Sequence, residues 1–378
     1  MRGSVIKRGT RWCVVVDLGR DPVTGKRIRN WHSGFESKKA AERARTEILS
    51  RLDKGTYVEP SRRTLTRFLL DEWLPATKGR LADSTFDSYT RNIELHIVPR
   101  LGAIELQALT PARLNAFYGD LLASGSHRAG ESGLAPKTVR NVHVILRKAL
   151  HDAVRWSLIS RNPAEMADPP RLRGSASSIK PWNAAEARAF LAHVASDEFV
   201  AAWILALTTG MRRGEILGLR WEDIDFDRAQ LSVRQTLVNV AYEVKLSSPK
   251  TVRSRRSLAL DTGTLAALHE HRTRVAGRPV DSTYGGLVFT RENGQWIHPD
   301  RFTQMFNKHV RSSKVTRIRF HDVRHTYATL ALTAGVHPKI VSERLGHATV
   351  AFTLDVYSHV IPGMQEDAAS LVAGLILG

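Results

Sequence analysis

One segment near the middle of the chain limits how the rest of it can fold. Pro169-Pro170 and Lys180-Pro181 enclose a run of small residues, Gly174 to Ser178, and neither a helix nor a strand readily continues through such a sequence. We therefore expect an interdomain linker there, and 378 residues are enough for two or three separate cores. The expected parts are residues 1–63, residues 64–172, a linker at residues 173–181, and residues 182–378.

Positive charge is concentrated in the first of these parts. Residues 1–63 hold 16 Lys and Arg against 7 Asp and Glu, within a chain whose net charge is +19. Such an excess favours a polyanionic partner, whereas 42% hydrophobic and 25% charged residues describe a folded chain and not a basic tail. Nucleic acid is the leading candidate for this partner.

Other features of the composition argue against several classes of protein. The single cysteine, Cys13, cannot form an internal disulfide or a cysteine metal cluster. The N-terminal sequence lacks the apolar stretch of a signal peptide, and no window approaches about 18 uncharged apolar residues. We expect a reducing, cytoplasmic setting and no membrane partner.

The local patterns predict a different fold class for each part. Residues 1–63 have three β-rich runs and one helical run, residues 64–172 have only helical runs, and residues 182–378 have helices around a few strands. The expected fold is therefore multidomain: a small sheet with one helix, an all-α domain, and a mainly helical α+β domain. The expected strands are Ser4–Lys7, Trp12–Leu18, Arg27–His32, Leu231–Val238, Tyr242–Leu246 and Arg256–Ala259, and the first helices are Lys38–Leu52, Thr64–Leu74, Ser84–Ile97, Thr110–Ser124 and Pro136–Trp156.

The third strand of the first part is a candidate DNA-contacting element. Period-two geometry places Arg27, Arg29 and Trp31 on one face of it. A strand that presents two cations and an aromatic ring is suited to a major groove. A solvated sheet face is the alternative interpretation.

Five separated segments of the last part together resemble the tyrosine recombinases, the phage-integrase family. They are Thr209–Trp221, Ser248–Thr251, Phe320–Tyr327, Arg344–His347 and Leu354–His359. Each segment alone is a weak signal, whereas the ordered combination is a strong one. The resemblance places the catalytic set of the family on Arg212, Lys250, His321, Arg324, His347 and Tyr357. The middle part is similar to the helical core-binding domain of the family, and the first part to its arm-site-binding domain.

The chemistry of DNA cleavage agrees with this assignment. Attack by an oxygen nucleophile adds negative charge to the non-bridging phosphate oxygens, which a planar guanidinium binds two at a time. Arg212 and Arg324 are the expected clamps, and His321 shares a helix face with Arg324 because the two are three residues apart. Taken alone, each is better explained as an ordinary surface residue, and only the other segments favour catalysis.

Tyr357 is the expected nucleophile. A free phenol has a pKa of about 10, so ionising it near pH 7 costs about 4 kcal/mol. We therefore expect His321 to act as the base, and His347 to act as a hydrogen-bond donor to the phosphate or as a secondary base. His359 is a supporting candidate, and Tyr327, the main rival nucleophile, is more typical of packing.

The departing 5′ oxygen needs a proton, and Lys250, in a turn between two expected strands, is the expected general acid. The alternative is a basic hairpin that contacts phosphate, since Arg253, Arg255 and Arg256 follow. Glu215, three residues after Arg212, is expected to support that arginine and not to bind a metal.

The resemblance implies a site-specific recombinase that forms a 3′-phosphotyrosine and integrates or excises a phage or other mobile element. It implies no cofactor and no metal, a homotetramer on DNA with contacts made by residues 367–378, and accessory directionality or bending proteins. A metal nuclease lacks the expected ligand spacing here. A type IB topoisomerase and a helix-turn-helix regulator built on residues 320–346 stay open as alternatives.

Overall fold

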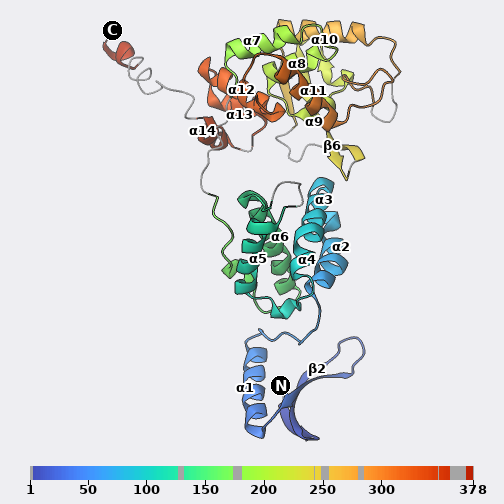
Figure 1. The fold of residues 1–378 in the computed structure, drawn as a ribbon, viewed down its shortest axis with the longest axis vertical. Coiled ribbons are helices and arrows are strands. Elements are labelled where there is room, and N and C mark those ends of the chain that lie inside the picture. Colours follow the sequence, from blue (N-terminus) through green and yellow to red (C-terminus); the bar gives the residue numbers. More distant parts are fainter. Residues whose placement is uncertain are drawn as a thin grey trace. The chain divides into compact units, whose positions relative to one another are not determined.

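The computed structural model describes residues 3–126, 132–172, 181–241, 243–247, 255–279, 285–347, 349–357 and 372–377. The chain divides into two compact units, Met1–Arg173 and Gly174–Gly378, which are described separately (Figure 1). None of the described helices is both long enough and apolar enough to cross a membrane.

The first unit begins with an antiparallel sheet covered by one helix. Strands β1 (Gly3–Arg8), β2 (Arg11–Arg20) and β3 (Arg27–Phe35) pair in that order, and α1 (Lys38–Asp53) packs on one face of them (Figure 1). The Ser37 hydroxyl caps α1 by accepting a hydrogen bond from the Ala40 amide. Val14 and Val16 of β2 form the core with the helix. The predicted sheet and helix are confirmed.

The register of this sheet determines which residues face away from α1. Trp31 pairs with Val15 and Arg29 with Asp17, so both lie on the face opposite the one that carries Val14 and Val16. Trp31 is exposed, and the Arg8 guanidinium lies 5.9 Å from the centroid of its ring. The face therefore presents an aromatic ring and cations to solvent.

The rest of the first unit is helical. Two of its four predicted helices are α5 (Pro111–Ser124), which Thr110 caps, and α6 (Pro136–Arg155). The other two are composite: a π-helical segment, Arg67–Trp73, continues into α2 (Leu74–Thr77), and α3 (Asp83–Asn92) continues through a π-helical segment, Ile93–Ile97, into α4 (Val98–Leu101). Short 3₁₀ turns lie at Lys78–Arg80, Leu106–Ala108 and Pro163–Met166.

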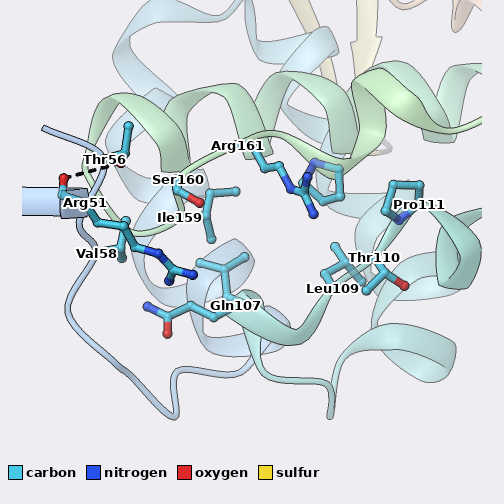
Figure 2. A pocket seen from close by; sticks show the side chains of 12 residues that line it. Arg51, Thr56, Val58, Gln107, Leu109, Thr110, Pro111, Ile159, Ser160 and Arg161 are labelled. Atoms are coloured by element: carbon cyan, nitrogen blue, oxygen red, sulfur yellow. Dashed lines mark hydrogen bonds between the residues drawn. The ribbon is translucent and has the colours of Figure 1, made fainter. Parts of the chain in front are cut away.

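The Gln107 side chain holds the segment that follows the sheet domain against the helical domain. Its Nε2 donates to the carbonyl oxygens of Glu59 (2.7 Å) and Leu158 (3.2 Å), and its Oε1 accepts from the Ser61 amide (3.2 Å). A polar pocket of about 320 Å³ lies beside it, and Figure 2 shows that Arg51 and Arg161 line this pocket together with Gln107.

The second unit surrounds two small sheets with helices. Strands β4 (Ile224–Asp225), β5 (Gln230–Val233) and β8 (Arg256–Ala259) form one antiparallel sheet, while β6 (Thr236–Val240) and β7 (Glu243–Ser247) form a separate hairpin. The helices are α7 (Ala184–His193), α8 (Val200–Thr209), α9 (Arg213–Leu217), α10 (Thr262–Arg274), α11 (Pro299–Ser312), α12 (Phe320–Thr333), α13 (Pro338–Leu345) and α14 (Val350–Tyr357), with a 3₁₀ turn at Trp221–Asp223.

An aromatic core fixes the start of α12. Trp203 of α8 stacks on Phe302 of α11 with ring centroids 4.5 Å apart, and Phe320, the first residue of α12, packs edge-on against Phe302 and Phe306. The Trp182 amide donates to the hydroxyl of Thr326, six residues further along α12. This core therefore holds the helix turn that begins with His321.

Helices α8 and α13 end at glycines that lie in the left-handed region, Gly210 (φ 64°) and Gly346 (φ 65°). A Cβ atom at Gly210 would lie 2.5 Å from Leu345 Cδ2 and 2.6 Å from Tyr327 Cδ1. The end of α8 therefore contacts α12 and α13 too closely for any side chain at position 210.

We expect Gly210→Ala to lower the free energy of unfolding by about 3 kcal/mol, because the left-handed backbone and the collision each cost about 1 to 2 kcal/mol. Gly335→Ala is the matched control, since Gly335 has φ 80° but nothing within 4 Å of its Cβ position. Urea denaturation of both variants tests this. Equal losses would contradict the close approach at Gly210.

Candidate active site

Tyr357 is the last residue of α14, and its ring is buried, with 2% of its surface exposed. Its hydroxyl oxygen lies 2.5 Å from Nδ1 of His325, which is half-buried on α12. Burial raises the pKa of Tyr357 to about 12, although the positive charge of Arg324 acts in the opposite direction. The hydroxyl is therefore protonated at neutral pH and held against a histidine.

The end of α13 gathers three arginines. A helix leaves its last carbonyl groups without partners inside the helix, and its C-terminus carries partial negative charge. Here three consecutive carbonyl groups each accept a hydrogen bond from a different guanidinium. The pairs are Arg256 Nε with Arg344 O (2.5 Å), Arg324 Nη2 with Leu345 O (2.6 Å) and Arg212 Nη2 with Gly346 O (3.3 Å).

Arg324 is the most deeply buried of the three, with 4% of its surface exposed. Its Nη1 donates to Gly210 O (3.0 Å), so one guanidinium joins the end of α8 to the end of α13. Burial and then the charge of Arg212 lower the pKa of Arg324 to about 9. The group remains a cation at neutral pH.

Glu215 lies between the other two arginines and is 5% exposed. Arg256 donates to both of its oxygens, from Nη1 to Oε1 (3.0 Å) and from Nη2 to Oε2 (2.8 Å). Arg212 donates from Nη1 to Oε1 and from its amide to Oε2, each at 2.9 Å. Burial raises the pKa of Glu215, but the hydrogen bonds and charges of the two arginines outweigh it and lower the pKa to about 2.

A cavity of about 380 Å³ opens beside these arginines. Among its lining residues, Arg212 comes from the predicted segment Thr209–Trp221, and His321 and Arg324 come from the predicted segment Phe320–Tyr327. Burial of His321 and the positive charge of the nearby Arg324 lower the pKa of His321. The remaining lining residues are Met211, Arg213, Thr303, Asn307, Arg319 and Phe320.

Two further histidines complete the cluster. His325 packs edge-on against His321, with ring centroids 5.3 Å apart, and His347 Nδ1 lies 2.8 Å from the Thr353 hydroxyl. Burial lowers the pKa of His325 to about 4 and that of His347 to about 3, and neighbouring arginines act in the same direction. Both rings are therefore neutral at pH 7 and able to accept a proton.

Among the predicted site residues, Arg212, His321 and Arg324 share one cavity, while His347 follows the helix end that holds the arginines. Lys250, Arg253 and His359 lie outside the described residues. Arg255 is exposed just before β8, and Arg27, Arg29 and Trp31 belong to the other unit. Tyr327, the rival nucleophile, accepts a hydrogen bond from Arg344 Nε (2.5 Å).

Sequence reasoning missed two members of the site. It chose His321 as the neighbour of the Tyr357 hydroxyl, whereas the structure places His325 there. The i,i+4 spacing of the two histidines, which places both rings near one helix face, is the signal that points to His325. The sequence shows Arg256 only as one member of a basic run, with no signal for a role in the site. Within the described part of the chain, no group of three His, Cys, Asp and Glu residues is placed to hold a metal.

Comparison with family models places three matches along the chain. A model described as the phage integrase family matches residues 184–363, an Arm DNA-binding domain matches residues 4–52, and a phage integrase N-terminal SAM-like domain matches residues 67–122. The site described above lies within the first match.

Similar proteins and structures carry related names. The integrase of Mycobacterium phage D29 is 30% identical over 278 residues, which cover 71% of this chain and 68% of the relative. A "tyrosine recombinase XerC-like" protein of Caldanaerobacter subterraneus is 28% identical and covers 99% of both chains. The Tn1549 transposon integrase, solved with transposon right end DNA, has a TM-score of 0.69 at 20% identity, over 82% of this chain and 99% of that one.

The low pKa of Glu215 predicts a contribution to stability that depends on pH. Because the pKa falls from an ordinary 4.5 to about 2 on folding, this contribution of about 3 kcal/mol is present above pH 4.5 and disappears towards pH 2. Unfolding free energies of the wild type and Glu215→Gln between pH 6 and pH 3 test it. The wild type should lose stability more steeply below pH 4.5, and parallel curves would contradict the prediction.

Proposed function

This chain belongs to the phage integrase family of tyrosine recombinases, enzymes that cleave and rejoin DNA strands, and on that basis we propose that it exchanges strands between specific DNA sites to integrate or excise a phage or another mobile element. The observation that carries the proposal is the Tyr357 hydroxyl, held against His325 in a cluster with the two clamp arginines. Relatives named as integrases, from Mycobacterium phage D29 and from the Bacillus subtilis element ICEBs1, support this class of substrate.

In the proposed reaction, the Tyr357 oxygen bonds to the scissile phosphorus and the bond from phosphorus to the 5′ oxygen breaks. The phenol becomes strongly acidic as its bond to phosphorus forms, and His325, which is neutral at pH 7, receives the proton. The incoming phosphate supports this transfer, because its negative charge raises the pKa of nearby histidines. The products are a 3′-phosphotyrosine and a free 5′ hydroxyl.

Arg212 and Arg324 bind the non-bridging oxygens in this proposal, since both line the cavity and both remain charged. His321 donates a hydrogen bond to the same phosphate from the cavity wall, and His347 supports the group from the end of α13. Lys250 protonates the 5′ oxygen, and His359 shares the proton-accepting and phosphate-binding work of the other histidines. These last two assignments rest on the sequence motif.

The reverse step joins strands. A 5′ hydroxyl from a partner duplex attacks the phosphotyrosine, so one ester replaces another and the chemistry consumes no cofactor. We assign a homotetramer on double-stranded DNA to this exchange, in line with the similar fold of lambda integrase, solved as a tetramer bound to a Holliday junction (TM-score 0.58, 17% identity). Accessory directionality or bending proteins and a nucleoid location complete the proposal.

Two surfaces serve binding and assembly in this scheme. The β3 face with Arg27, Arg29 and Trp31 contacts DNA outside the cleavage site, and Arg255 contacts phosphate near it. Of residues 367–378, the described part, Val372–Leu377, is helical and exposes Leu375, Ile376 and Leu377. We assign this apolar segment to a contact with the next copy in the tetramer.

Tyr357→Phe should bind its DNA site but form no covalent adduct, because it keeps the ring and lacks the attacking oxygen. A nicked suicide duplex, incubated with protein in a chelating buffer and followed by peptide mapping, tests this. Tyr327→Phe is the control and should still form the adduct on the peptide that contains Tyr357. An adduct with the Tyr357→Phe protein would place the nucleophile elsewhere.

His325→Gln should slow adduct formation by about 10² to 10⁴-fold, the usual effect of losing a general base. In the wild type the rate should fall as His325 protonates, at a pH above the pKa of about 4 of the DNA-free site, because the bound phosphate raises this pKa. A fluorinated tyrosine at position 357, which has a lower pKa, should partly rescue His325→Gln and not His321→Gln. Rescue of His321→Gln alone would restore the sequence-based choice of base.

A further inference from the structure

We propose that Arg256 is a third functional arginine of this site, a positioning residue that orients Arg212 for the phosphate through Glu215. This inference rests on the proposed function and deepens it. Neither the family motif nor the cavity points to Arg256, because it is absent from the motif residues and does not line the cavity. Its role follows from its contacts.

The Arg256 side chain is buried, with 7% of its surface exposed. Its hydrogen bonds include a bidentate fork to Glu215 and a bond to the Arg344 carbonyl at the end of α13. The backbone of Arg256 is fixed as well, because it pairs with Val233 in the sheet. A rigid guanidinium thus holds Glu215 from one side.

Glu215 transmits this position to Arg212. The Arg212 side chain is 39% exposed, and the contacts that orient its guanidinium are Glu215 Oε1 and the Gly346 carbonyl. Arg256 donates to Glu215 Oε1 directly. It also donates to the Arg344 carbonyl, which lies at the same end of α13 as the Gly346 carbonyl. Displacing Arg256 would therefore move both supports of the clamp together.

Charge gives a second reason for Arg256. Burial alone favours the neutral form of a carboxyl group. The hydrogen bond from Arg256 is the largest factor that keeps Glu215 ionised. Arg212 and Arg324 also face Glu215. A neutral Glu215 would release Arg212, so Arg256 keeps the clamp engaged at the pH of catalysis.

Strand β8 begins at Arg256, and the preceding connection from β7 contains Lys250. The residue that supports the phosphate clamp therefore also anchors the end of the segment that carries the expected general acid.

The test compares Arg256→Met, which removes the charge and the fork, with Arg256→Lys, which keeps the charge and loses the fork. Arg228→Met is the matched control, since Arg228 is 81% exposed and its ion pair to Asp225 is 3.8 Å long. Single-turnover cleavage of the suicide duplex and the Kd for the same DNA are measured for each protein. A displaced clamp costs about 10²-fold in rate.

We expect Arg256→Met to cleave about 10²-fold more slowly and Arg256→Lys to fall between it and the wild type. The Kd should change little, because the side chain does not reach the surface, and Arg228→Met should match the wild type. Glu215→Gln should slow cleavage by a smaller factor in the Arg256→Met protein than in the wild type, because the two residues act as one unit.

Three results would overturn the inference: wild-type cleavage by Arg256→Lys, equal loss of binding and cleavage in Arg256→Lys, or additive effects of the Glu215 and Arg256 changes. If thermal melting shows that Arg256→Met does not fold, Arg256→Lys decides. Wild-type protein that forms no adduct would instead overturn the proposed function. If the wild type forms the adduct and Arg256→Lys cleaves as fast as the wild type, only the role of Arg256 is overturned.

Discussion

Carbonyl oxygens at the end of α13 draw three guanidinium groups into a space where those groups would otherwise repel one another. Arg256, Arg324 and Arg212 bond to successive carbonyls, and the partial negative charge of the helix terminus favours each of them. One carboxylate, Glu215, forks between two of the three. The cluster therefore keeps excess positive charge, which suits a site that receives a phosphate anion.

The protonation states of this cluster are set by the same surroundings. Burial and the arginines keep His325 and His347 neutral, while burial keeps the Tyr357 hydroxyl protonated with a pKa of about 12. The resting site thus contains a proton acceptor beside a proton donor that does not transfer its proton. An anion in the cavity changes that balance, since it raises the proton affinity of the histidines.

Much of the fold could be predicted because local rules decide it. Thr110 before a proline specifies a helix start, and the alternating β-rich runs specify a hairpin sheet. The predicted strand Leu231–Val238 is instead two strands in different sheets, and between them Gln235 donates to the Gly218 carbonyl (2.8 Å). The π-helical segments likewise depend on packing that a local pattern does not contain.

The site shows the same limit. Helical spacing placed His321 and Arg324 on one face, but His325 lies near that face too, and only the position of α14 decides which ring meets Tyr357. Arg256 could not be selected from its basic run, because its partner Glu215 is 41 residues away in sequence. Long-range pairs of this kind are set by the tertiary fold and leave little local trace.

The Tyr357 ring packs in a small apolar cluster with Leu332, Val341 and Leu345, separate from the large core around Trp203. Few contacts of the main core therefore depend on how α14 packs. The stability of the domain and the orientation of its nucleophile therefore depend on different contacts. Substitutions in α14 can change the reactivity of Tyr357 while the rest of the domain stays folded.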